Sequence, residues 1–261
     1  MPIHRTIETI RPTQSEFGQI AYDLMRCVFD IHDEFGRFFD ETVYKRELAH
    51  RMSGIELELP VTVSHKDFSK LYKLDVLAHQ RGIFEFKAAE SIVSRHRGQT
   101  INYLLLFDLP HGKIINVRPE QVGSEFVNCH LRLTEMRNPT VITAGLDPAV
   151  EGASYFYDLL MSLIQDWGAG LDTKLYEEAL TYFLGGEERV VIPIPVIGCN
   201  GHLHDQKMHV LAPDIAFKIT AFPNRLEAFE LHSRRLLKHT SLKAIQWANI
   251  THQRIDFTTI R

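Results

Sequence analysis

The stretch from Leu74 to Glu90, LDVLAHQRGIFEFKAAE, contains two apolar runs separated by a short polar turn. The turn, HQRG at 79–82, predicts that the runs on either side of it are neighbouring strands of one sheet. Side chains alternate across a strand, so Phe84 and Phe86 should pack on one face of that sheet. The charged residues of the hairpin must then lie on the other face, where they are either solvated or chemically active.

Those charged residues have the chemistry of a metal site. Glu85 and Lys87 share one face, and Asp75 can lie beside them if the two strands are adjacent. Two carboxylates offer the hard oxygen ligands that suit Mg²⁺ or Mn²⁺. Phosphodiester hydrolysis needs a metal to activate water and offset charge, and an ammonium can orient that water. The alternative is a solvated strand face with a cross-strand ion pair.

The segments around this hairpin predict a mixed sheet flanked by helices. Apolar residues recur at helical spacing from Ser15 to Glu34, Asp40 can cap a second helix, and a third helix fits roughly 94–107. Extended runs cover 56–63, 71–78, 82–87 and 112–117. Two helices, three strands, a helix and a strand in this order are typical of an α/β domain.

The composition is that of a globular protein with no strong bias toward one partner. The 261 residues carry a formal net charge of −4, so a nucleic-acid partner would have to meet a local basic patch. The three cysteines, Cys27, Cys129 and Cys199, lie far apart, which favours free thiols in a reducing compartment. We expect neither a leader nor a membrane span, and therefore a cytoplasmic protein.

The second half of the chain resembles the first. Two stretches align at a constant offset: 158–180, DLLMSLIQDWGAGLDTKLYEEAL, and 26–48, RCVFDIHDEFGRFFDETVYKREL. Both contain a glycine, an aspartate, a tyrosine and a leucine at the same spacing. Similarity at a fixed offset usually means structural repetition, although two α/β halves can also be alike by chance. The expected organisation is an N-terminal arm over 1–12, one unit over 13–132, a linker over 133–150 and a second unit over 151–261.

The spacing of Asp75 and the run Glu85-Phe86-Lys87 resembles the D-x(n)-E-x-K signature of the PD-(D/E)XK nuclease superfamily. The stretch 28–48 is similar to the entry motif of one branch, the bacterial GxxExxY proteins. HRGQTINYLLLF at 96–107 resembles the Gln-x-x-Asn-Tyr-Leu helix of that branch, and GKIINV at 112–117 resembles its final strand. The resemblance covers nearly the whole first half. It implies an α/β fold of two tandem restriction-endonuclease-like units, each a mixed sheet flanked by helices.

Carried over to this sequence, the resemblance implies a site for Mg²⁺ or Mn²⁺. Asp75 and Glu85 would bind the metal, and Lys87 would be the catalytic lysine. Glu41, the motif glutamate, would be a further ligand or a contact to a metal-bound water, although a first-turn glutamate can also simply interact with its helix dipole. Gln99, on the following helix, would support the site.

The sequence departs from the family pattern in both halves. In the first half Phe38 replaces the motif glycine, and the motif tyrosine, Tyr44, is expected to pack and to hydrogen-bond. The second half keeps a glycine but loses the carboxylates. Its expected matches are Thr173 for Glu41, His209 for Asp75, Ala216 for Glu85 and Lys218 for Lys87. We therefore expect a degenerate copy and one active centre per chain.

Two basic stretches could track a phosphate backbone, SRHRG at 94–98 and HSRRLLKH at 232–239. The candidate nucleic-acid-binding residues are Arg95, Arg97, Arg234, Arg235 and Lys238. Ordinary helix-surface charge explains each stretch equally well. The stretch CNGHLHDQKMH at 199–209 offers zinc-capable side chains, but its spacing matches no standard zinc module.

Two functions from different classes follow from these patterns. The first is a metal-dependent nuclease that cleaves phosphodiester bonds, in DNA rather than RNA. The second is a catalytically inactive binding or scaffold protein that keeps a nuclease fold, because fold alone does not fix function. The tandem units could form an internal pseudo-dimer, which favours a monomeric chain.

Overall fold

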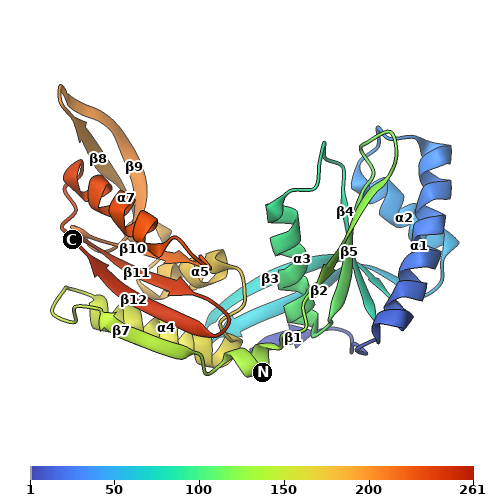
Figure 1. Ribbon diagram of the computed structural model, residues 1–261, viewed down its shortest axis with the longest axis horizontal. Coiled ribbons are helices and arrows are strands. Elements are labelled where there is room, and N and C mark those ends of the chain that lie inside the picture. The colour runs from blue at the N-terminus through green and yellow to red at the C-terminus, as the bar shows by residue number, and fades with distance from the viewer. Residues whose placement is uncertain (1) are drawn as a thin grey trace. The chain divides into compact units, whose positions relative to one another are not determined.

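The computed structural model describes residues 2–261 and divides into two compact units. Unit 1 comprises the chain up to Ser64 and the segment Ser69–Leu133, and unit 2 comprises His65–Phe68 and Thr134–Arg261. Each unit is a six-stranded mixed sheet with helices on both faces (Figure 1). This confirms the predicted fold class.

The helices of unit 1 begin and end at recognisable signals. Helix α1 (Gln14–Phe35) starts with a capping box, in which Thr13 and Glu16 exchange side-chain and backbone hydrogen bonds. It ends at Gly36, whose φ of 72° suits glycine. Helices α2 (Glu41–Arg51) and α3 (Ser94–Phe107) follow. Asp40 occupies the N-cap position of α2, as predicted, but its side chain makes no capping hydrogen bond.

The sheet of unit 1 has the strand order β1-β2-β3-β4-β5-β6. The strands are β1 (Ile3–Arg5), β2 (Ile55–His65), β3 (Phe68–Ala78), β4 (Gly82–Lys87), β5 (His111–Asn116) and β6 (Gly123–Asn128). Strands β3 and β4 pair antiparallel, β4 and β5 parallel, and β5 and β6 antiparallel. Helices α1 and α2 cover one face and α3 lies against the other (Figure 1). The approach of α3 is close, because a Cβ on Gly112 would lie 3.3 Å from side-chain atoms of Leu104 and Thr100.

The N-terminal residues are not a loose arm, which corrects the expectation for 1–12. Met1 lies outside the described residues, but β1 pairs antiparallel with β2. Arg5 then donates to the carbonyl of Leu106 at 2.6 Å, and Thr9 donates to that of Phe107 at 2.7 Å. The segment therefore satisfies the last carbonyls of α3, which have no partner inside the helix.

Unit 2 starts inside the segment that the sequence predicted to be a linker. Its first elements are the 3₁₀ turn η1 (Leu133–Met136) and β7 (Thr140–Gly145), which pairs in parallel with β12. The helices are α4 (Ala153–Trp167), α5 (Thr173–Phe183), α6 (Glu187–Val190) and α7 (Leu226–Lys238). The other strands are β8 (Val191–Gly198), β9 (Gly201–Ala212), β10 (Ile215–Thr220), β11 (Ala244–Ile250) and β12 (Arg254–Ile260). The segment 133–150 thus contributes an edge strand to the second sheet.

The two sheets share their topology. The order β2-β3-β4-β5-β6 in unit 1 corresponds to β8-β9-β10-β11-β12 in unit 2. As in unit 1, β9 and β10 are antiparallel, β10 and β11 parallel, and β11 and β12 antiparallel. The extra strands differ, because β1 extends the first sheet beside β2 whereas β7 extends the second beside β12.

A shared hydrogen bond marks the helix pair of each unit. The hydroxyl of Tyr44 donates to the carbonyl of Gly36, and the hydroxyl of Tyr176 donates to that of Gly168. Both tyrosines are fully buried. Each bond fixes the loop between two helices against the core, which accounts for the spacing of the glycine and the tyrosine in both halves. Within residues 2–261, no helix is both long enough and apolar enough to span a bilayer.

Candidate active site of the first unit

The β3–β4 hairpin places its charged residues together. Val76 pairs with Phe84 and Leu77 with Ile83, and one further step of the same register brings Asp75 opposite Glu85. The Nζ of Lys87 lies 2.6 Å from Oε1 of Glu85. The expected alternation therefore holds along β4.

Phe84 and Phe86 point to the opposite face, where they pack with α1 and α2 in the core of unit 1. The side chain of Glu85 is 1% exposed, so the charged face of the hairpin is not a solvated one at this position. The interpretation as an ordinary surface ion pair does not fit a carboxylate buried to this degree.

Glu85 carries a buried negative charge that its neighbours compensate only in part. Its Oε2 is buried and receives no hydrogen bond from any residue in the described range 2–261. Burial raises the pKa of Glu85 to about 7, with a further increase from the negative charge of Asp75, while Lys87 acts in the opposite direction. An oxygen in this state is suited to accept either a proton or a cation.

Asp75 is held by two donors. Its Oδ1 accepts from Nζ of Lys45 at 2.8 Å, and its Oδ2 accepts from the backbone N–H of Phe86 at 3.0 Å. The same ammonium also donates to Glu58 of β2. Desolvation opposes the charged form of Lys45, but its bonds to the two carboxylates leave its pKa raised overall. Sequence reasoning missed both Lys45 and Glu58.

A signal for Lys45 exists in the sequence. It follows Tyr44 on the motif helix and lies one turn after Glu41, so both side chains project from the same side of α2. Its side chain is only 5% exposed, which is rare for a lysine unless it is paired. Glu58 has a positive φ of 52° in β2, a local irregularity that the sequence pattern does not reveal.

Glu41 and Gln99 lie at the edges of this cluster. Oε2 of Glu41 accepts from the backbone N–H of Ala88 at 3.0 Å, which brings its carboxylate to the end of β4. Gln99 is exposed on α3 and interacts with the hydroxyl of Tyr103. That hydroxyl donates to the carbonyl of Lys73 at 2.5 Å. Burial, followed by the charge of Glu85, raises the pKa of Tyr103 to about 12.

The carboxylates of this cluster are suitable ligands for a hard divalent cation, but there are few of them. Oε2 of Glu85 lacks a donor, and Asp75 adds a second carboxylate beside it. In the part of the chain that the structure describes, however, no group of three or more His, Cys, Asp or Glu side chains is arranged to hold a metal. Any ion here would be bound by two carboxylates, with its other ligands from water or backbone.

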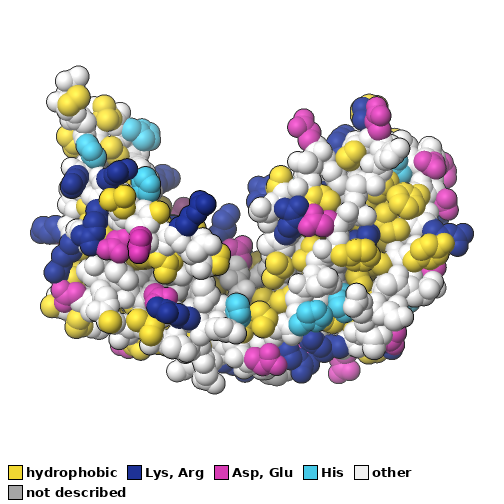
Figure 2. All heavy atoms as spheres, in the orientation of Figure 1, with side chains coloured by type: hydrophobic (Ala, Val, Ile, Leu, Met, Phe, Trp, Pro, Cys, Tyr) yellow, Lys and Arg dark blue, Asp and Glu magenta, His cyan; other side chains and the backbone are white. Residues whose placement is uncertain are grey.

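The predicted nucleic-acid-binding residues lie in different settings. Arg97 forms two hydrogen bonds to the carboxylate of Glu125, at 2.5 and 2.7 Å, whereas Arg95 is exposed at the start of α3. Arg234 donates to Glu230 and to the C-terminal carbonyl of Arg261. Arg235 and Lys238 are exposed on α7. Figure 2 shows lysine and arginine side chains gathered over the region of α7 and its neighbouring strands.

Phe38 and the histidine-rich stretch complete the predicted features. Phe38 is 79% exposed in the loop between α1 and α2, with the guanidinium of Arg37 5.2 Å from its ring centre. In the stretch 199–209, His202 bonds to Asp205 at 2.7 Å and Cys199 is exposed. No zinc-type cluster forms there among the described residues.

The equivalent strands of unit 2 can be aligned through two asparagines. Oδ1 of Asn116 accepts from the N–H of Ala89 at 3.1 Å, and its Nδ2 donates to the carbonyl of Ala89 at 2.7 Å. Asn249 makes the same two bonds to Phe222, at 2.8 and 3.0 Å. The pair of bonds holds the chain just after β4 in unit 1 and just after β10 in unit 2.

This alignment corrects the expected correspondence of the two halves. Lys87 pairs with Asn116, and Thr220 pairs with Asn249, so Thr220 holds the place of Lys87. Two residues earlier, Lys218 holds the place of Glu85. The expected matches of Glu85 to Ala216 and of Lys87 to Lys218 are wrong, because similarity between FEFK and IAFK contains no information about hydrogen-bond register.

The charges are reversed at these equivalent positions. Lys45 follows Tyr44 in α2, and Glu177 follows Tyr176 in α5. In unit 1 the lysine on the helix bonds to a carboxylate on the sheet, whereas in unit 2 Lys218 on the sheet donates to Glu177 on the helix at 2.6 Å. Unit 2 therefore has a cation where unit 1 has its buried glutamate.

Comparison with known proteins identifies one relationship. Residues 18–127, from α1 to β6, match the family described as the PD-(D/E)XK nuclease superfamily. Nucleases of this superfamily generally use divalent metal ions. No curated protein and no solved structure matches the chain.

Proposed function

We propose that unit 1 is a metal-dependent nuclease that hydrolyses phosphodiester bonds. The observation that carries this proposal is the state of Glu85. Its carboxylate is buried and lacks a donor at Oε2, lies beside Asp75, and has the ammonium of Lys87 2.6 Å from its other oxygen. A structural ion pair does not need a second carboxylate beside the buried one, whereas a cation site does.

Each residue of the cluster has a role in this proposal. Asp75 and Glu85 bind Mg²⁺ or Mn²⁺, and Glu41, whose carboxylate lies at the end of β4, contacts a metal-bound water. The bound ion would activate water and neutralise charge on the phosphate. Lys87 orients the attacking water, since its ammonium is fixed by Glu85 rather than mobile in solvent. Lys45 is a positioning residue that holds Asp75 through a direct hydrogen bond.

The matched family supports nucleic acid as the substrate, and we propose DNA rather than RNA as that nucleic acid. Arg95, which is exposed at the start of α3, supplies a cation for the phosphate backbone in this proposal. Arg97 can contribute only if its bond to Glu125 opens. Gln99 supports the site through the hydroxyl of Tyr103.

A second candidate is a nuclease-fold protein that binds without cleaving. The observation in its favour is that both oxygens of Asp75 already accept hydrogen bonds, so a metal would have to share them with Lys45 and the backbone. The loss of carboxylates from the equivalent strand of unit 2 points in the same direction.

A cleavage assay separates these candidates. Linear, circular and single-stranded DNA and an RNA would each be incubated with the purified chain in Mg²⁺, Mn²⁺ or EDTA. We expect cleavage of DNA that requires the metal and is lost in Asp75→Ala and Lys87→Ala. Lys243→Ala, which removes an ion pair with Asp214 in unit 2, is the matched control and should keep full activity. Absence of cleavage on every substrate would favour the binding protein.

A further inference from the structure

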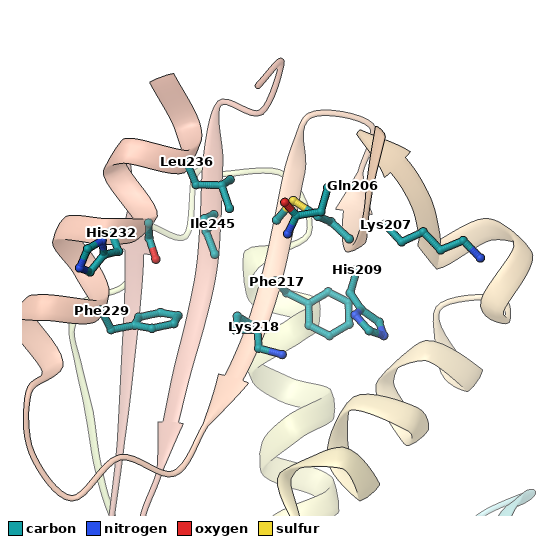
Figure 3. A pocket seen from close by; sticks show the side chains of 11 residues that line it. Gln206, Lys207, His209, Phe217, Lys218, Phe229, His232, Leu236 and Ile245 are labelled. Atoms are coloured by element: carbon teal, nitrogen blue, oxygen red, sulfur yellow. The ribbon is translucent and has the colours of Figure 1, made fainter. Parts of the chain in front are cut away.

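Unit 2 contains a cavity at the place where unit 1 has its carboxylates. The cavity has a volume of about 310 Å³ and lies between α7 and strands β9, β10 and β11 (Figure 3). Lys218, the residue in the position of Glu85, is part of its wall. Ligand pockets in proteins begin at about 300 Å³, so the cavity can accept one small molecule or one residue of a polymer.

The walls of this cavity are largely apolar and include a rigid aromatic surface. Met208, Phe217, Leu236 and Ile245 line it together with Phe229 of α7. Phe217 is buried against the ring of Phe156, but Phe229 is partly exposed. The ring of Phe229 rests on the indole of Trp247, with the two centres 4.6 Å apart. The ring of Phe222 also contacts that of Phe229, with the centres 5.6 Å apart, so two aromatic neighbours support Phe229 while it lines the cavity.

The polar groups of the cavity are cationic or neutral. Lys218, Lys207, His209 and His232 contribute to its lining, and no aspartate or glutamate within the described chain does so. Figure 3 shows Lys218 between the rings of Phe217 and Phe229, whereas the ammonium of Lys207 points away from them. Lys218 gives one hydrogen bond to Glu177, and an ammonium has three to give. Its side chain is 46% exposed, so the remaining donors are accessible to a ligand.

We propose that this cavity binds one unpaired nucleotide of a nucleic acid. The base stacks on Phe229, and the phosphate is bound by Lys218 with His232 at the rim. Every base has a π face, so stacking on an aromatic side chain is tolerant of sequence, and a lysine recognises phosphate as a point charge. The choice of nucleic acid over another aromatic anion rests on the function proposed for unit 1. Unit 2 then holds the strand without cleaving it, because it lacks the carboxylate pair.

The test is a calorimetric titration of the full chain with deoxyadenosine 5′-monophosphate in EDTA, where no cleavage can occur. Adenosine and inorganic phosphate serve as separate probes for the two halves of the ligand. We expect the nucleotide to bind at least tenfold more tightly than either part. Phe229→Leu and Lys218→Gln should each weaken binding at least tenfold, whereas Lys243→Gln, at an exposed lysine of the same unit, should leave it unchanged.

Two further measurements make the outcome decisive. The thermal unfolding midpoint of Lys218→Gln and Phe229→Leu identifies a variant that fails to fold, and Lys218 is too exposed for its loss to unfold the unit. Lys87→Ala should bind the nucleotide normally, so a failure of cleavage does not alter this result. The proposal is overturned if the nucleotide does not bind at millimolar concentration, or if binding survives both unit 2 variants and is lost in Lys87→Ala.

Discussion

The ammonium of Lys45 lies 2.8 Å from Oδ1 of Asp75, in the interior of unit 1. This bond connects helix α2 to the charged face of the β3–β4 hairpin. It places one positive charge against Asp75, while Lys87 places another against Glu85. The buried carboxylate of Glu85 and the partly buried carboxylate of Asp75 are thus each held by a lysine, and the site is organised before any ligand binds.

Replacing Lys45 should destabilise the fold. Lys45→Met leaves Asp75 without its charged partner, and breaking a buried ion pair costs about 3 kcal/mol or more. We expect the free energy of unfolding, measured with urea, to fall by about 3 kcal/mol. Lys243→Met is the matched control, because that lysine is 78% exposed and its pair should contribute less than about 1 kcal/mol. Equal effects of the two substitutions would show that Lys45 is not a buried partner of Asp75.

The raised pKa of Glu85 makes stability depend on pH. Its pKa is about 7 in the folded chain against 4.5 for the unperturbed carboxyl, so the folded state holds the proton more tightly. Glu85 therefore lowers stability progressively as pH rises from 4.5 to 7, and its full effect is present above pH 7. The difference of about 2.5 units corresponds to about 3 kcal/mol. In EDTA, Glu85→Gln should therefore gain about 3 kcal/mol relative to the wild type between pH 4.5 and pH 8, measured by urea unfolding. A parallel pH dependence in both proteins would contradict the assignment.

A divalent ion should stabilise the same site. Because Mg²⁺ or Mn²⁺ would bind the folded chain alone, saturation at 100 times the dissociation constant would contribute about 2.7 kcal/mol. We expect the thermal unfolding midpoint to rise on addition of Mn²⁺ and to return with EDTA. Asp75→Asn and Glu85→Gln should abolish this rise, whereas Asp214→Asn, at a partly exposed carboxylate of unit 2, should retain it. An identical rise in all four proteins would indicate binding elsewhere.

The tyrosine hydrogen bonds of the two units should contribute similarly to the free energy of unfolding. Tyr44→Phe and Tyr176→Phe each remove a buried hydroxyl that bonds to a glycine carbonyl. Each should lower the free energy of unfolding by about 1–2 kcal/mol, because the carbonyl is left without its partner. Tyr155→Phe, at a side chain that is 51% exposed, should change it by less than about 0.5 kcal/mol. A large effect in one unit alone would argue against equivalent roles.

Much of the fold and part of the site followed from local patterns in the sequence. The alternation in FEFK predicted which side chains of β4 enter the core, and the short turn at 79–82 predicted the hairpin that brings Asp75 to Glu85. Helix α1 was predictable from its apolar period and from Gly36 at its end. These features depend on neighbours within a few residues, which a sequence displays directly.

The missed features depend on partners far apart in the chain. The polar residues 2–12 show no local pattern of a strand or helix, because what orders them lies far away in the sequence. Strand β1 pairs with β2, and Arg5 bonds to the end of α3. Strand β7 was hidden in a segment with two prolines because its partner, β12, is the last strand of the chain. Lys45 was missed, since its neighbours in the sequence do not indicate that Asp75 and Glu58 accept hydrogen bonds from its ammonium. Only the pairing register of β10 with β11, compared with that of β4 with β5, shows that Lys218 and not Ala216 occupies the position of Glu85.

The most direct test of the proposed nuclease is the rate of DNA cleavage in Mg²⁺ by the wild type and by Glu85→Gln. The substitution keeps the shape of the side chain and removes its charge, so it separates a metal-binding carboxylate from a packing group. We predict metal-dependent cleavage by the wild type and a loss of at least a hundredfold in Glu85→Gln, with an unchanged or increased stability at pH 8. Cleavage at the wild-type rate by a folded Glu85→Gln protein would contradict the account.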